Sequence, residues 1–239
     1  MDNWLDSLLS QNKIFTADTL FMYWDGFVAT VQLSVISLLV GLLLAVVLAV
    51  LRSTRKPILS WPIYLFCYVF RGTPLLIQLY IIYYGITYVD GIQETFWWEW
   101  FKNPFYPALL AFTLNTCAYT TEILYGAISE TDHRELEAAR AYGMSWWTSM
   151  HRVVLPGAIR RSLPAYANEV VLLLQSTSIA SVITIIDITG AAQNTYSRHY
   201  APFEAFIFAA CLYLVITFTI LYGFRRLESR LLAYTRPRQ

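Results

Sequence analysis

Long stretches without a charged side chain are the feature that most limits what this chain can fold into. Residues 26–51 contain no Asp, Glu, Lys or Arg, and Arg71 alone separates the uncharged stretches 57–70 and 72–89. About 20 apolar residues in a helix cross the hydrocarbon core of a bilayer. Charged residues make up 14% of the chain, against about 25% in soluble domains. The sequence therefore predicts an integral membrane protein.

Five spans account for the apolar blocks. We expect an all-α membrane protein with a single domain over residues 1–239 and transmembrane helices at 26–51, 58–83, 107–128, 162–186 and 205–224. The second span must include Arg71, because residues 58–70 alone would form a helix of about 20 Å, too short for a hydrocarbon core of roughly 30 Å.

The basic residues predict the orientation of these spans. Cytoplasmic loops of membrane proteins are enriched in Lys and Arg. Most of the 17 basic residues follow the first, third and fifth spans: Arg52, Arg55, Lys56, Arg134, Arg140, Arg152, Arg160, Arg161, Arg225, Arg226, Arg230, Arg236 and Arg238. We therefore expect the N-terminus outside, the C-terminus inside and the loop 129–161 in the cytoplasm.

The outer loop from Asp90 to Pro107 is rich in aromatic residues, including Trp97, Trp98 and Trp100. Such residues are typical of an interfacial belt at the membrane surface, which is the interpretation we favour. The alternative is a docking surface for an extracytoplasmic partner.

Several classes of function are excluded by simple observations. The net charge of +1 and the lack of a dense basic run give no reason to expect nucleic acid as a partner. His133, His151 and His199 lack the spacing of metal ligands. The lysines lie outside any GxxxxGK[ST] pattern, so we expect no nucleotide or other cofactor bound by this chain itself.

The cytoplasmic loop 129–161 is long for a simple connection. Asp132 followed by Glu135 predicts a capping box that opens a helix, and Gly143 is a natural stop for it. Ser145 can cap a second helix, which we expect Pro156 to end. The loop is thus predicted to form a pair of helices parallel to the membrane. Its small residues would allow close approach by another protein.

A known family resembles this loop. Glu137-Ala138-Ala139, then Gly143, then Val153-x-Leu155-Pro156 resembles the cytoplasmic "EAA" motif of the membrane subunits of ABC importers, with Val153 in place of the usual Ile. In that family the motif forms a coupling helix that enters a cleft of a separate ATPase subunit. The resemblance implies this contact for Glu137, Ala138, Ala139, Arg140, Gly143 and Pro156.

Other segments resemble the polar amino-acid branch of these importers. Arg71-Gly72-Thr73-Pro74 is similar to its RGTP motif, and Ala118-Tyr119-Thr120-Thr121-Glu122 to its third-span signature. Asn168-Glu169 followed by Ser176-Thr177-Ser178 is similar to its fourth-span pattern. The stretch 111–122 is similar to the M-type membrane subunit of histidine/lysine/arginine/ornithine importers and their opine-transport relatives.

The resemblance implies a set of partners and a location. We expect a bacterial inner-membrane protein that forms a pore with a second permease subunit, either a paralogue or an identical chain. Two ATP-binding cassette subunits would bind ATP and Mg, and a periplasmic protein would deliver the substrate.

Ionisable groups inside a bilayer usually face an aqueous pathway or the interior of a helix bundle. Arg71 either recognises the α-carboxylate of a substrate or ties backbone carbonyls at the Gly72–Pro74 break. Glu169 either pairs with a cationic substrate or locks the fourth span to a neighbour by a hydrogen bond, and Glu122 is expected to be structural. Thr73, Asn115, Asn168, Gln175, Ser176 and Thr177 either line the path or act as packing contacts.

One departure from the family bears on the substrate. Many relatives carry Lys where this chain has Gln175, and the loss of a cation lowers the barrier to a cationic substrate. This favours arginine, lysine, histidine or ornithine over glutamate, and the alternative is a permease for other polar amino acids such as glutamine or glutamate. The rival classes are a secondary transporter or channel, which has no use for the EAA loop, and an intramembrane enzyme, for which we find no catalytic constellation.

Overall fold

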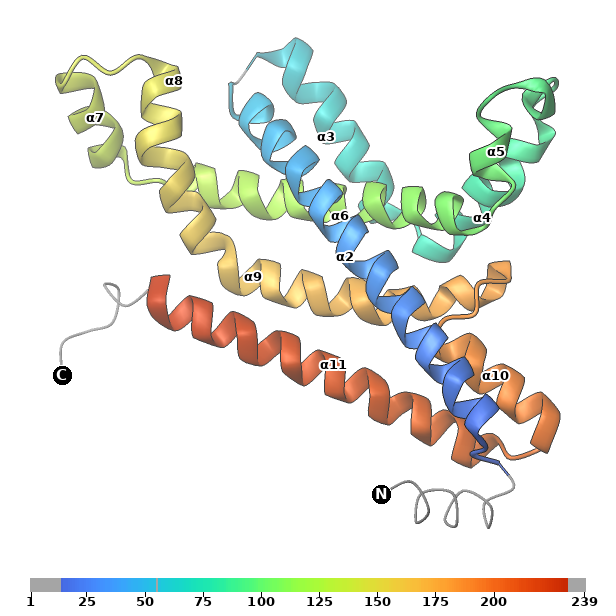
Figure 1. Cartoon of the computed structure of the whole chain (residues 1–239). Helices are drawn as coiled ribbons and strands as arrows, with labels where there is room; N and C mark the ends of the chain where they lie inside the picture. Colours follow the sequence, from blue (N-terminus) through green and yellow to red (C-terminus); the bar gives the residue numbers. More distant parts are fainter. Residues whose placement is uncertain (1–13, 55, 232–239) are drawn as a thin grey trace. The chain divides into compact units, whose positions relative to one another are not determined.

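The computed structural model describes residues 14–54 and 56–231, whose regular structure is helical throughout (Figure 1). Arg55, Arg236 and Arg238 lie outside the described residues. The N-terminal half contains α2 (Ala17–Ser53), α3 (Pro57–Gly72), α4 (Leu75–Gly85), η1 (Ile86–Tyr88), η2 (Ile92–Glu94), α5 (Trp98–Phe101) and α6 (Phe105–Ser129). The C-terminal half contains α7 (His133–Ala141), α8 (Trp146–Ser149), η3 (Met150–Val154), α9 (Leu155–Ser176), η4 (Thr177–Ile183), α10 (Ile188–His199) and α11 (Pro202–Leu231).

The chain divides into two compact units. The first contains the described parts of Met1–Ile36, Leu79–Phe112 and Leu173–Phe218, and the second those of Ser37–Gln78, Thr113–Leu172 and Thr219–Gln239. The unit boundaries therefore fall inside the long helices α2, α6, α9 and α11. The single domain predicted over 1–239 stays a prediction.

Three helical stretches within the described residues are long and apolar enough to cross a membrane: Ala17–Ser53, Trp146–Ile183 and Pro202–Leu231. A fourth is added if the bent pair Pro57–Gly72 and Leu75–Tyr88 counts as one span. The predicted all-helical membrane class is confirmed. The count of five spans and their orientation stay predictions.

The second predicted span is not one straight helix. It breaks between α3 and α4, which meet at an angle of 103° (Figure 1). Pro74 lacks a backbone N–H and disfavours helical geometry in the residue before it, and Thr73 is accordingly extended, with φ −116° and ψ 143°. The Gly72–Pro74 segment thus interrupts the span that the sequence places over residues 58–83.

Helix α6 matches the third predicted span closely, but it is not among the stretches that are apolar enough to cross a membrane by composition alone. Its composition explains this, because Thr113, Asn115, Thr116, Thr120 and Thr121 are polar. All five are buried in the structure, so these polar side chains do not lie on the exposed surface of the helix.

The prediction that Pro156 ends the second loop helix is wrong. The chain runs without interruption from α8 through η3, which is a π-helical turn, into α9, where Pro156 is the second residue. A proline ring clashes with the carbonyl four residues earlier in an α-helix, here that of Arg152. This carbonyl belongs to the π turn, whose hydrogen bonds reach one residue further, and the proline is tolerated there.

Each unit has its own core. In the first, Tyr23 donates a hydrogen bond to the carbonyl of Ala205 at 2.8 Å and packs with Ile188 and Ala209. In the second, Ala45 and Ala49 of α2 pack against Cys117 and other residues of α6. Gly41 lets these two helices approach closely, since a Cβ there would lie 2.5 Å from the Thr116 methyl group.

Candidate functional site

One face of α6 in the second unit carries the side chains that hold the α3–α4 break. Asn115, Tyr119 and Glu122 are spaced i, i+4 and i+7, so they line up along one side of the helix. The Tyr119 hydroxyl donates to the carbonyl of Arg71 at 3.5 Å, and the Arg71 guanidinium lies 5.4 Å from the centre of the Tyr119 ring. This face therefore contacts the break directly.

The break leaves backbone carbonyls without helical partners, and two amide side chains satisfy them. Gln78 Nε2 donates to the carbonyls of Phe70 at 2.7 Å and Thr73 at 3.0 Å, and to the Thr73 hydroxyl at 2.8 Å. Asn115 Nδ2 donates to Gln78 Oε1 at 3.1 Å and to the Phe70 carbonyl at 3.4 Å. Gln78 and Asn115 thus bind the backbone at the break, whereas the Arg71 side chain is directed elsewhere.

Glu122 lies between two arginines. Its Oε1 is 2.5 Å from Nη1 of Arg52 and 3.6 Å from Nη1 of Arg71. The Arg52 guanidinium is also 4.1 Å from the centre of the Tyr125 ring and 5.4 Å from that of Tyr64. Only 8% of Arg52 is exposed, so this residue, which the sequence places in a cytoplasmic loop, is a buried ion-pair partner.

Glu169 of α9 is buried and contacts α6. Its Oε1 accepts a hydrogen bond from the Thr116 hydroxyl at 3.0 Å, which is the kind of contact that the structural alternative for Glu169 requires. The polar group of the second unit comprises side chains that lie on α6 or contact it, namely Arg52, Arg71, Gln78, Asn115, Thr116, Glu122 and Glu169.

The remaining predicted pathway residues are more scattered. Asn168 is exposed on α9. Gln175, Ser176 and Thr177 belong to the first unit; Gln175 is exposed, and the buried Thr177 hydroxyl donates to the carbonyl of Leu174 at 2.6 Å. The structure thus gathers Arg71, Thr73, Asn115 and Glu169 in one unit and places the last three predicted residues in the other.

Helix α7 in the loop 129–161 begins and ends at the residues that the sequence predicts. Asp132 caps its N-terminus by accepting from the N–H of Arg134 at 2.9 Å. At its C-terminus the N–H of Met144 donates to the Ala139 carbonyl and that of Gly143 to the Arg140 carbonyl. This pair of bonds is a Schellman motif, which needs a left-handed residue, and Gly143 has a φ of +73°.

The coupling residues differ in how far they can reach a partner. Glu137, Ala138, Arg140 and Gly143 are exposed, and so is Pro156, whereas Ala139 is only 4% exposed. Ala139 therefore packs inside its own chain. Three aromatic side chains next to Gly143 are exposed, namely Tyr142, Trp146 and Trp147, and they widen the surface that the loop presents.

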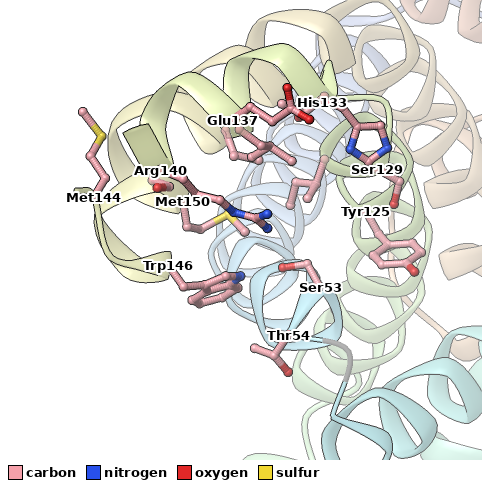
Figure 2. A pocket seen from close by; sticks show the side chains of 15 residues that line it. Ser53, Thr54, Tyr125, Ser129, His133, Glu137, Arg140, Met144, Trp146 and Met150 are labelled. Atoms are coloured by element: carbon pink, nitrogen blue, oxygen red, sulfur yellow. The ribbon is translucent and has the colours of Figure 1, made fainter. Parts of the chain in front are cut away.

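A hollow of about 590 Å³ lies between this loop and the ends of α2 and α6. Figure 2 shows Arg140 extending into it, with Trp146 and Ser53 on one side and His133 and Ser129 on the other. Glu137 also lines the hollow. Glu137 and Arg140, two of the predicted coupling residues, thus border a space that lies between α7 and the ends of α2 and α6.

Comparison with known proteins identifies the family. The family model described as "Binding-protein-dependent transport system inner membrane component" matches residues 20–233. The chain belongs to this family. The predictions of a non-catalytic transport subunit and of an inner-membrane location are confirmed by this match.

Several permeases of the family are similar over most of their length. The chain is 45% identical over 192 residues to the nopaline transport system permease protein NocM of Agrobacterium fabrum, covering 80% of both chains. It is 43% identical over 215 residues to the histidine/lysine/arginine/ornithine transport system permease protein HisM of Escherichia coli, covering 90% of both. A crystal structure of an amino acid ABC transporter with histidines superposes with a TM-score of 0.77 at 30% identity, covering 87% of this chain and 94% of the other.

Sequence reasoning missed three members of the polar group in the permease. Arg52 was counted only among the basic residues expected on the cytoplasmic side, and Gln78 and Thr116 were not singled out. The spacing of Asn115, Tyr119 and Glu122 on one helical face is a signal that could have pointed to a partner for Glu122. The identity of that partner depends on how α2 packs against α6, which no local pattern encodes.

Proposed function

We propose that this permease carries basic amino acids or their opine derivatives inward through an ATP-driven importer. The similarity over 90% of its length to a histidine/lysine/arginine/ornithine permease supports this most strongly. The similarity to nopaline and octopine permeases, at 45% and 41% identity, supports opines as the second candidate. Glutamine and glutamate remain the less favoured substrates.

Two charged residues would recognise the two ends of such a substrate. The Arg71 side chain is 43% exposed and matches a carboxylate with its planar fork of donors. Glu169 would pair with the ammonium or guanidinium group. Thr73, Asn115 and Asn168 would line the same part of the path, and Gln175, Ser176 and Thr177 another part.

The energy for transport would come from partner subunits. The exposed part of the EAA loop, with Glu137, Ala138, Arg140 and Gly143, would dock an ATP-binding cassette subunit that binds ATP and Mg. The assembly would contain two such ATPases, a second permease subunit and a periplasmic binding protein. Closure of the ATPases would move the loop and, through the continuous stretch from α8 to α9, the pathway residues.

The decisive experiment for the substrate is uptake by the reconstituted importer. The permease, its ATPase, its partner permease and its binding protein are placed in vesicles, and ATP-dependent uptake of labelled amino acids is measured. Arginine, lysine, histidine or ornithine should enter at least about tenfold faster than glutamine or glutamate, which is the discrimination expected from one charge-assisted contact of about 1.5 kcal/mol. Equal rates for glutamate and arginine would contradict the proposal.

We also propose five spans, with the N-terminus outside and the C-terminus inside. The bent α3–α4 pair and α6 would join the three long apolar stretches, because the polar side chains of α6 are buried in the protein rather than exposed to lipid. A reporter fused at the C-terminus should be active in the cytoplasm, and one inserted between Asp90 and Pro107 should be active outside. Finding both reporters active on the same side would rule out the five-span arrangement.

A further inference from the structure

Glu122 is shared unequally by two arginines. Arg52 Nη1 lies at 2.5 Å from Glu122 Oε1, whereas Arg71 Nη1 lies at 3.6 Å from the same oxygen. Charge-assisted N–H···O bonds are usually about 2.7–2.9 Å long, so the contact with Arg71 is an ion pair without a good hydrogen bond.

The surroundings of the two arginines also hold Arg52 more tightly than Arg71. The Arg52 side chain is 9% exposed and lies against two tyrosine rings. The Arg71 side chain is 43% exposed and lies near one ring, that of Tyr119. Arg52 is therefore held in place by packing, and Arg71 is free to exchange one anionic partner for another.

We infer that Glu122 is an internal counter-ion for Arg71, and that the carboxylate of the substrate takes its place when substrate binds. This inference rests on the proposed role of Arg71 in binding that carboxylate. Glu122 would then be a positioning residue, acting on the substrate only through Arg71. Arg52 would keep Glu122 neutralised during the exchange, so that no carboxylate is left unpaired away from water.

The arrangement has a consequence for selectivity. An unpaired guanidinium in a membrane span is costly and attracts any anion. When no substrate is bound, Glu122 would keep Arg71 paired and aligned over Tyr119. A competing internal partner multiplies the apparent affinity for the substrate by the fraction of Arg71 that is not paired with Glu122. The affinity for other carboxylates is lowered by the same factor.

Direct binding to the purified permease–ATPase complex, without the binding protein, tests the exchange. The probes are arginine and agmatine, which is arginine without its carboxylate. Glu122→Gln removes the competing charge and should tighten arginine binding by about threefold to fivefold, the range expected from an ion pair of this exposure. Agmatine binding should not change. The matched control is Glu99→Gln, which breaks an exposed ion pair with Lys102 in the outer loop and should alter neither ligand.

Two further variants separate the possible failures. Arg71→Gln should reduce the preference for arginine over agmatine; if it does not, the proposed role of Arg71 is wrong. If Arg71→Gln has this effect but Glu122→Gln leaves arginine binding unchanged, the counter-ion inference alone is overturned. Should Glu122→Gln fail to assemble because Arg52 is left unpaired, the double variant Arg52→Gln/Glu122→Gln removes both charges. The double variant should bind arginine more tightly by the same factor and agmatine no more tightly. If arginine binding to the double variant is unchanged, the inference is refuted.

Discussion

A permease carrying Gly143→Asp is expected to insert into the membrane normally but to lose its ATPase and its transport activity. Gly143 is exposed, and a Cβ at this position would meet nothing within 4 Å in the chain itself. An Asp side chain therefore has room until a partner docks. At the docked surface it would be a buried, unpaired carboxylate, which costs several kcal/mol. Each 1.4 kcal/mol is a factor of ten in affinity, so ATPase capture should fall by roughly a hundredfold or more.

The control for this prediction is Gly143→Asn. Asn and Asp have nearly the same shape, and both tolerate the left-handed backbone that φ +73° requires. The Asn variant should keep the Schellman motif and retain most of the ATPase, as measured by co-purification from membranes with matched permease levels. Normal capture and uptake by Gly143→Asp would refute the coupling role of this loop. Equal loss in both variants would assign the effect to volume rather than charge.

The helix caps of the loop 129–161 could be predicted because capping is local. Asp132, Ser145 and Gly143 act on N–H and carbonyl groups within a few residues of themselves, and the sequence contains all the partners. Pro156 was misjudged because its effect depends on the hydrogen-bond register of the preceding turn. A π turn supplies a geometry that accommodates the proline ring. The residue types of Met150–Val154 do not indicate that this segment forms a π turn.

The membrane class and the position of α6 could also be predicted from the sequence, since apolar blocks and helix length determine them. The pairing inside the polar group could not. Glu122 lies near the C-terminal end of α6, and its contacts with Arg52 and Arg71 bring α6 together with α2 and α3, which precede it by 50 residues or more at the contacting positions. Positive-inside reasoning assigns Arg52 to the loop because it counts charges along the chain and has no information on burial.

Glu169→Gln is expected to reduce uptake of arginine or lysine by roughly tenfold to a hundredfold, which corresponds to losing one hydrogen bond to a charged group at about 1.5–3 kcal/mol. Glutamine keeps an oxygen that can accept the hydrogen bond from Thr116, observed at 3.0 Å. The contact between α9 and α6 is thus retained, and only the charge is lost. Substrate-stimulated ATP hydrolysis should fall more than the basal rate, and the amount of assembled complex should stay the same.

Thr116→Val is the matched control, because it keeps the shape of residue 116, removes the hydrogen bond to Glu169 and leaves the carboxylate in place. If the charge of Glu169 binds the substrate, Thr116→Val should affect uptake much less than Glu169→Gln. If the residue serves only to hold α9 against α6, the order is reversed: the valine variant loses the contact and assembles poorly, while the glutamine variant keeps it and transports basic amino acids at the unmodified rate. Uptake by the two variants, normalised to assembled complex, therefore decides between the two roles that the sequence left open for Glu169.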